Sequence, residues 1–319
     1  MANWRYYVRL DSSVGLTVNF LGDELLEPLE EDNSHSKSLW TYADCHARIF
    51  GPKDAYPLSY NRDLTIDAYS AKEYAKFREN KNIKKTVLVQ PEHYGTDNRC
   101  LLDAISSLYR HPGEDETFQI KGIAKIESNL EDEKLESLAN SGVVGARFEM
   151  RRGFSGLSWE EADRLAWRIN DIGWTVELYM DGSDIHEVEK NINSWPGWVV
   201  FPHLGQFKRT LTTQQRSFTS LTRLIDRDKA WVKISAPYIL SPNDNLDDQK
   251  VTEIITALAK WAPERLVWGT NWPHLEKKGD TAIDEELLEL MNKWVPNEAN
   301  RKLIMCENAN ILYNFSVSL

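Results

Sequence analysis

The sequence predicts an α/β fold, a (β/α)8 TIM barrel that follows a short N-terminal extension resembling a β-hairpin. Two observations lead to this fold class. Short runs rich in β-branched residues alternate with amphipathic helical stretches along most of the chain, which is the order of elements in a closed parallel barrel. In addition, the first run is followed by IFGPKDAYP, which lacks the glycine-rich phosphate loop expected of an open, doubly wound sheet.

Residues 1–40 form the predicted extension, and residues 41–319 form the predicted barrel. The segments WRYYVRL and LTVNF alternate apolar and polar residues around the turn-like DSSVG, as the two strands of a hairpin do. The polar stretch EPLEEDNSHSKS that follows is typical of a linker. We therefore expect the first forty residues to be an appendage of the main body.

Eight predicted strands carry β-branched and aromatic residues in short runs. They lie at residues 41–50, 85–90, 120–127, 142–150, 174–180, 197–204, 230–235 and 264–271. Apolar residues recur with the period of a helix in the stretches between them, at residues 70–80, 98–110, 130–140, 158–170, 184–195, 217–226 and 248–262. This regular alternation predicts that the strands pair in sequence order.

Composition and charge exclude several classes of function. The net charge is −11 and the basic residues form no stripe or tail, which argues against nucleic acid as a partner. No apolar run reaches the roughly eighteen residues of a membrane-spanning helix, and no secretory leader opens the chain. The cysteines, Cys45, Cys100 and Cys306, are far apart and odd in number, as in a reduced compartment. We expect a cytoplasmic protein.

Polar side chains gather where the predicted strands end. Active sites of such barrels lie at the carboxyl ends of the strands, and alternation along each strand predicts which side chains point inward. The polar residues expected to point inward are Asp44, His46, Arg48, Arg147, Glu149, Arg151, Glu177, Tyr179, His203, Lys233, Ser235 and Asn271. An apolar core would not collect so many polar groups, so these positions predict a functional site.

Several motifs in order make the chain resemble the amidohydrolase superfamily. They are DCHARIFGP, GVVGARFEM, PHLG, VKISAPY, LVWGTNWPH and the terminal ENANILYNF. The resemblance covers roughly residues 40–315 and is to the amidohydrolase-related branch that includes 2-pyrone-4,6-dicarboxylate hydrolase, a lactonase. It implies a mechanism without metal, in which an Asp on the eighth strand activates water while histidines and arginines hold the substrate carbonyl and carboxylates.

The chain departs from that pattern at key positions. Asn271 stands where the resemblance places the water-activating Asp, and an amide cannot take a proton from water. Arg48 replaces the second His of the first-strand motif, Pro202 replaces a common Asp, and Ile239 aligns with an Arg of the lactonase. Arg147 matches the family. The scaffold is therefore expected to persist without the hydrolytic centre.

The same residues argue against a bound metal or other cofactor. A zinc site needs three or four nitrogen, oxygen or sulfur ligands. His46 and His203 supply two, Asn271 is a poor third, and Arg48 would place a positive charge beside the ion. We expect no catalytic metal and no cofactor.

We expect four catalytic residues: His46, Arg48, His203 and Asn271. Asn271 is expected to donate a hydrogen bond through its amide group to a substrate oxygen. Arg48 either forms a structural ion pair with Glu149 or Glu177, or clamps a carbonyl or carboxylate. The residues expected to bind the substrate are Arg147, Arg151, Glu177, Tyr179, Ser235, Tyr238, Trp272 and His274.

Two of these residues belong to the loop after the eighth strand. Trp272 is expected to form part of an apolar pocket wall, and His274 to lie near the barrel mouth as a proton donor or a surface residue. His93, in the loop after the second strand, is also close enough in the predicted fold to reach the site. Each therefore extends the predicted site beyond the strands themselves.

The leading functional hypothesis is an enzyme acting on a small oxygenated molecule, such as a lactone, a pyrone or another carbonyl compound. It would polarise the carbonyl by hydrogen bonding for a cyclisation, isomerisation or elimination. One alternative is a lactone or ester hydrolase in which His46, His203 or Glu177 acts as the base. A second is a non-catalytic binding protein built on a barrel that has lost its activity. A homo-oligomer is compatible with each.

Overall fold

The computed structural model describes residues 40–59, 66–110, 117–151, 156–207, 212–241, 245–277 and 283–316. Apart from Trp40, the predicted extension lies outside the described residues, so both the hairpin and the domain boundary remain predictions. Every helix in the described ranges is too short or too polar to cross a lipid bilayer.

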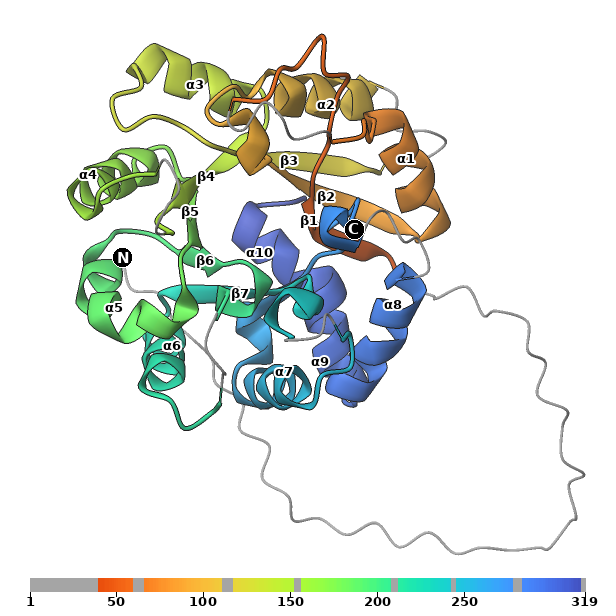
Figure 1. Ribbon diagram of the computed structural model, residues 1–319, viewed down its shortest axis with the longest axis vertical. Coiled ribbons are helices and arrows are strands. Elements are labelled where there is room, and N and C mark those ends of the chain that lie inside the picture. Colours follow the sequence, from red (N-terminus) through yellow and green to blue (C-terminus); the bar gives the residue numbers. More distant parts are fainter. Residues whose placement is uncertain are drawn as a thin grey trace, which may run out of the picture. The chain divides into compact units, whose positions relative to one another are not determined.

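Eight parallel strands form a single sheet in sequence order, which confirms the predicted (β/α)8 barrel. The strands are β1 (Tyr42–Ala47), β2 (Ile83–Val89), β3 (Gln119–Ala124), β4 (Val143–Glu149), β5 (Thr175–Tyr179), β6 (Val199–Phe201), β7 (Ala230–Ile234) and β8 (Leu266–Trp268). Helices α1 to α8 lie outside the strands (Figure 1). The register places Arg147 opposite Glu177 and Glu149 opposite Tyr179, so polar residues of neighbouring strands meet at one end of the barrel.

Seven predicted helices are present, and three more follow β8. The predicted ones are α1 (Ala71–Asn80), α2 (Arg99–Arg110), α3 (Asp132–Asn140), α4 (Trp159–Asn170), α5 (Ile185–Ser194), α6 (Arg216–Asp226) and α7 (Gln249–Trp261). The additional helices are α8 (Ile283–Trp294), α9 (Glu298–Lys302) and α10 (Asn308–Tyr313). Local sequence fixes several of the starts: Ser70 with Glu73, and Ser158 with Glu161, form capping boxes at α1 and α4.

The core has two layers, separated by the strands. The outer layer lies between strands and helices, where Leu88, Leu178 and Phe201 are fully buried. The inner layer fills the barrel with Val87, Val89, Ile123, Val200 and Trp231, and the α10 residues Leu312 and Tyr313 pack against it. This packed interior leaves the carboxyl ends of the strands, here called the barrel mouth, as the place for a site.

The seam between β1 and β8 is held mainly by one buried carboxylate. Asp44 accepts hydrogen bonds from Thr270 N (2.9 Å), Thr270 Oγ1 (2.7 Å), His46 N (3.0 Å) and Tyr74 Oη (2.9 Å). At Gly269 the strands approach so closely that an added Cβ would lie 2.6 Å from the His46 Cβ. Beyond the strands, Asn271 N donates to His46 O at 2.8 Å.

The prediction that Asp44 points to the same side of β1 as His46 and Arg48 is wrong. The pairing of β1 with β2 shifts register between Asp44 and Ala47, and such an irregularity breaks the strict alternation of side chains. As a result the Asp44 carboxylate turns toward Tyr74 of α1, whereas the His46 ring lies beside His203 inside the mouth.

We predict that Asp44→Ala lowers the free energy of unfolding by about 3 kcal/mol, because it leaves several buried donors without an acceptor. Urea unfolding followed by circular dichroism measures the effect. Asp54→Ala is the matched control, since Asp54 is exposed. A loss for Asp44→Ala no larger than that of the control would show that the seam does not depend on this carboxylate.

Candidate active site

Two neutral histidines lie at the centre of the barrel mouth. The rings of His46, at the end of β1, and His203, after β6, have centroids 4.5 Å apart. Ser235 orients the His203 ring, with its Oγ 3.0 Å from Nδ1 and 3.3 Å from the His203 backbone nitrogen. Neither ring nitrogen of His46 has a hydrogen-bond partner among the described residues. The His46 ring can therefore bond to a ligand.

The environment keeps both imidazoles uncharged at neutral pH. Burial lowers the pKa of His203 to about 3, and the positive charge of Arg48 adds to this effect. Burial likewise holds the pKa of His46 well below its usual value, with further contributions from His203 and Lys233. Both rings are consequently hydrogen-bonding groups and weak bases.

A fully buried ion pair lies below the histidines. The Lys233 ammonium on β7 donates to the Glu177 carboxylate on β5 and, at 2.7 Å, to the backbone oxygen of Cys45. Tyr179 Oη donates to the other oxygen of Glu177 at 3.0 Å. That oxygen is also 3.5 Å from His46 Nδ1. Glu177 therefore binds both Lys233 and Tyr179, and the predicted substrate contacts of Glu177 and Tyr179 remain predictions.

The carboxylates nearest to the two histidines and Arg48 are bound to cations of the protein. Across the described ranges, no group of three or more His, Cys, Asp or Glu side chains is arranged to hold one. Glu177, the carboxylate nearest to His46, is occupied by the Lys233 ammonium. A metal ion held by His46 would need Glu177 as its acidic ligand. The Lys233 ammonium already binds that carboxylate.

Arg48 forms its ion pair with a residue that the sequence interpretation missed. Its Nη2 lies 3.2 Å from both carboxylate oxygens of Glu276, in the short turn η6 (Leu275–Lys277) after β8. The predicted partners, Glu149 and Glu177, are wrong because each is occupied by other cations. Burial raises the pKa of Glu276, but the Arg48 charge, together with hydrogen bonds from the backbone and from Arg48, holds that pKa below the usual value.

A chain of hydrogen bonds fixes the side chain of Asn271. Asp284 on α8 lies 3.0 Å from His274 Nε2, and His274 Nδ1 lies 3.0 Å from Tyr238 Oη. Since a carboxylate only accepts, Asp284 favours the Nε2–H tautomer of His274, and in that tautomer Tyr238 donates to Nδ1. Tyr238 Oη in turn accepts from Asn271 Nδ2 at 2.8 Å. The other Nδ2 hydrogen goes to Glu276 Oε2 at 3.2 Å.

The amide oxygen of Asn271 is therefore the atom left for a ligand. It is buried and has no hydrogen-bond partner among the described residues. The sequence interpretation expected Asn271 to donate to a substrate oxygen, but both amide hydrogens are taken by Tyr238 and Glu276. Asn271 is instead placed to accept a hydrogen bond, for example from a hydroxyl group.

The other two residues expected near β8 are held by contacts within the protein, and their predicted part in substrate binding remains a prediction. His274 is buried between Tyr238 and Asp284, so it is not a surface residue. Trp272 packs its ring against the aromatic residues Tyr69, Tyr74 and Phe77. The first orients Tyr238, and the second fills the space between the seam and α1.

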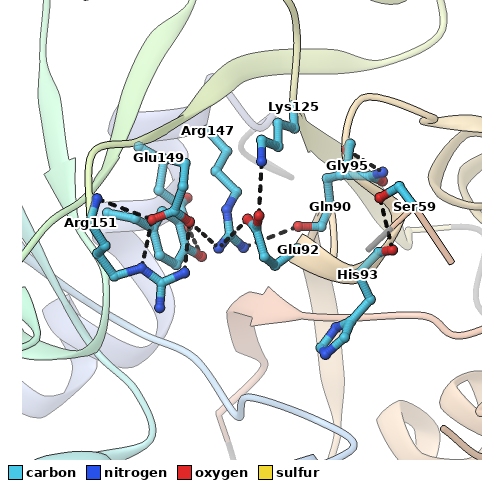
Figure 2. A network of polar contacts seen from close by, with 11 residues as sticks. Ser59, Gln90, Glu92, His93, Gly95, Lys125, Arg147, Glu149 and Arg151 are labelled. Carbon is cyan, nitrogen blue, oxygen red and sulfur yellow. Dashed lines mark hydrogen bonds and ion pairs between the residues drawn. The ribbon is translucent and has the colours of Figure 1, made fainter. Parts of the chain in front are cut away.

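The arginines of β4 belong to a second polar network (Figure 2). Glu149 accepts from Arg147 Nη2 at 2.9 Å and, in a bidentate contact, from Arg151 at 2.6 and 2.7 Å. Arg147 Nη2 also lies 3.1 Å from Glu92, which binds Lys125 Nζ at 2.9 Å. Burial opposes ionisation of Glu149, but the two guanidinium groups hold its pKa at about 2. The predicted substrate-binding arginines are thus already paired.

Left-handed backbone occurs at three of the residues that line or support the mouth. His203, Asn271 and His274 have φ angles of 51°, 66° and 58°, a region that costs energy for residues with a side chain. All three lie in the segments that follow β6 or β8. Such strain persists where the surrounding hydrogen bonds hold it, and it often marks a functional site.

The Amidohydrolase family model matches residues 43–315. The chain belongs to the amidohydrolase family. This amidohydrolase is 27% identical over 280 residues to 2-pyrone-4,6-dicarboxylate hydrolase of Comamonas testosteroni, covering 85% of this chain and 89% of the relative. It is 28% identical over 247 residues to D-galactarolactone isomerase of Agrobacterium fabrum, covering 76% and 81%.

A solved structure shares the fold of this chain. An Agrobacterium tumefaciens protein determined without ligand superposes with a TM-score of 0.77 at 26% identity, covering 87% of this amidohydrolase and 97% of that chain. The relatives thus include enzymes named as a hydrolase and as an isomerase. The reaction class of this amidohydrolase has to be argued from its own site.

We predict that the His203 imidazole stays neutral well below pH 6, because its pKa is lowered to about 3. The unfolded chain, with ordinary histidines, binds more protons between about pH 6.5 and pH 3, so this group destabilises the fold as the pH falls through that window. Nitrogen-15 NMR of the imidazoles measures it, with His203→Gln identifying the signal. A titration midpoint near 6.5 would refute the described burial.

Proposed function

We propose that this amidohydrolase catalyses an isomerisation of a small lactone-type molecule by intramolecular acyl transfer. A hydroxyl oxygen of the substrate bonds to the lactone carbonyl carbon, the original ring carbon–oxygen bond breaks, and the hydroxyl proton passes to the leaving oxygen. The observation that carries the proposal is the buried, unpaired acceptor oxygen of Asn271 at the position of a water-activating base. Cyclisation and elimination, also expected from the sequence, remain predictions.

We assign the orientation of the reacting groups to Asn271 and Arg48. The Asn271 oxygen accepts a hydrogen bond from the attacking hydroxyl and aligns it without removing its proton. Arg48 Nε is buried with no hydrogen-bond partner among the described residues, so it is available to donate to the carbonyl oxygen as negative charge develops there. Because Glu276 binds both side chains, it sets their spacing.

Proton transfer falls to the neutral histidines. The two ring nitrogens of an imidazole can accept a proton at one atom and release one from the other. His46 suits this role because both of its nitrogens are buried and free of hydrogen bonds to described residues. Its lowered pKa disfavours a long-lived imidazolium. The ring would therefore pass the proton on quickly from one oxygen of the substrate to another.

A second candidate function, hydrolysis of the lactone, is favoured by one specific observation. Glu276 is a carboxylate whose Oε2 lies 3.2 Å from Asn271 Nδ2, so it can replace the family Asp as the base that activates water. The predicted alternative bases suit this role less well, because Glu177 is bound to Lys233 and the pKa values of His46 and His203 are lowered. The Arg48 charge also weakens Glu276 as a base.

Turnover in oxygen-18 water separates the two functions. We predict that the purified enzyme interconverts ring sizes in a panel of hydroxylated γ- and δ-lactones, seen by NMR, and that mass spectrometry finds no oxygen-18 in the product. Intramolecular transfer uses only oxygen already in the substrate. Enzyme-dependent appearance of a labelled carboxylate would contradict isomerisation, and its loss in Glu276→Gln would establish Glu276 as the base.

Asn271→Asp provides the matched variant for the same assay. The new carboxylate should introduce hydrolysis and oxygen-18 incorporation, since it restores a base at the end of β8. Asn191→Asp, on the exposed side of α5, makes the same change of charge away from the mouth and should leave the product unlabelled. Equal labelling by both variants would show that the position of Asn271 is not special.

A further inference from the structure

The cations at the centre of the mouth are each bound to a carboxylate of the protein. Arg48 contacts both oxygens of Glu276 at 3.2 Å. Lys233 and Glu177 form an ion pair in which both side chains have no exposed surface. An anionic substrate would meet cations whose charge is already compensated, and displacing a partner from a buried pair leaves an uncompensated charge.

The cations on the β3 and β4 side are bound in the same way (Figure 2). Glu149 receives both Arg147 and Arg151, and its carboxylate oxygens match the planar fork of Arg151 in a bidentate contact. Glu92 binds Lys125 and Arg147. The face of the Arg147 guanidinium is also covered, because it stacks 3.6 Å above the Tyr179 ring.

A pocket of about 520 Å³ opens beside this network, and acidic groups outnumber basic ones in its described lining. Lys125 and Arg147 are its two cations, whereas Glu127, Glu149 and Glu161 contribute three carboxylates. A negatively charged group entering here would meet net repulsion. The volume is nevertheless large enough for a small ring compound.

Several of the groups with free hydrogen-bonding capacity are uncharged, and the unpartnered Nε atoms of Arg48 and Arg147 belong to guanidinium groups whose charge is compensated by glutamates. His46 and Asn271 have buried polar atoms without partners among the described residues, and burial lowers the pKa of His93 to about 4, assisted by the charge of Arg48. Ile239, next to Tyr238 in the turn η4 (Pro237–Leu240), exposes 40% of its surface. His46 and Asn271 therefore offer a ligand hydrogen bonds without adding a charge.

We propose that the substrate is an uncharged, hydroxylated lactone, with no carboxylate or sulfonate group. This inference rests on the proposed function for the lactone ring and adds the charge of the molecule that carries it. It separates this chain from its 27% identical relative, whose name describes a dicarboxylate as its substrate. In this chain, glutamates of the protein occupy the cations that could hold such groups.

A matched pair of ligands tests the charge directly. The probes are 2-pyrone-4,6-dicarboxylate and its dimethyl ester, which share one ring and differ in charge, and calorimetry on the full chain measures binding. We expect the ester to bind at least about tenfold more tightly than the diacid. Its affinity should also change little between about 0.05 M and 0.5 M salt, because no ion pair forms.

Three results would overturn the proposal: tighter binding of the diacid, an affinity for the diacid that falls steeply with salt, or binding of neither probe. The assay measures equilibrium binding without turnover. Failure of the proposed isomerisation would instead appear as oxygen-18 in the product, so the two failures are distinguishable.

A gain of anion binding provides the complementary test. Glu149→Gln removes the carboxylate that occupies Arg147 and Arg151, so the diacid should bind about tenfold or more tightly to the variant than to the unmodified chain. Glu189→Gln is the control, because it releases Arg223 and Arg227 on the outer helices. Circular dichroism verifies that the variant is folded. Equal affinity of the Glu149→Gln variant and the unmodified chain for the diacid would then contradict the proposal.

Discussion

The buried Asp44 carboxylate at the seam between β1 and β8 is the constraint on which the site depends. The first and last strands of a barrel are far apart in sequence, and here the carboxylate binds Thr270 of one and the backbone of the other. Gly269 permits the close approach that this requires. The seam brings Arg48 and Asn271 to the same Glu276 carboxylate, so the interactions that complete the fold also set the geometry of the mouth.

Placement of charge decides what chemistry such a mouth favours. A carboxylate bound by a guanidinium is a weaker base, and an imidazole buried among cations stays neutral. Both effects operate here: Arg48 lowers the pKa of Glu276, and burial with Arg48 lowers that of His203. The mouth is therefore better suited to orienting groups than to generating hydroxide from water. The Asp284–His274–Tyr238 chain also orients rather than ionises, since it fixes the direction of the Asn271 amide through hydrogen bonds.

Much of this could be predicted from sequence, and the exceptions have physical causes. Strand periodicity placed His46, His203 and Asn271 correctly at the strand ends, because side-chain alternation and parallel order are local properties. Glu276 was missed because it lies in a turn beyond β8, whose path depends on tertiary contacts. The irregularity that turns Asp44 outward depends on how β1 pairs with β2, and Asp44 then bonds to Thr270, more than two hundred positions away. The hydrogen bond from the Asn271 amide to Tyr238 spans 33 positions.

The central claim is that Asn271 presents its oxygen to the substrate because both of its amide hydrogens are bound by the protein. Neutron diffraction from deuterated crystals measures this most directly, since it distinguishes the amide nitrogen from the oxygen and locates the deuterons. The account predicts one Nδ2 deuteron directed at Tyr238 Oη and the other at Glu276. An amide turned the other way, with its oxygen accepting from Tyr238 and its NH₂ group facing the mouth, would contradict it.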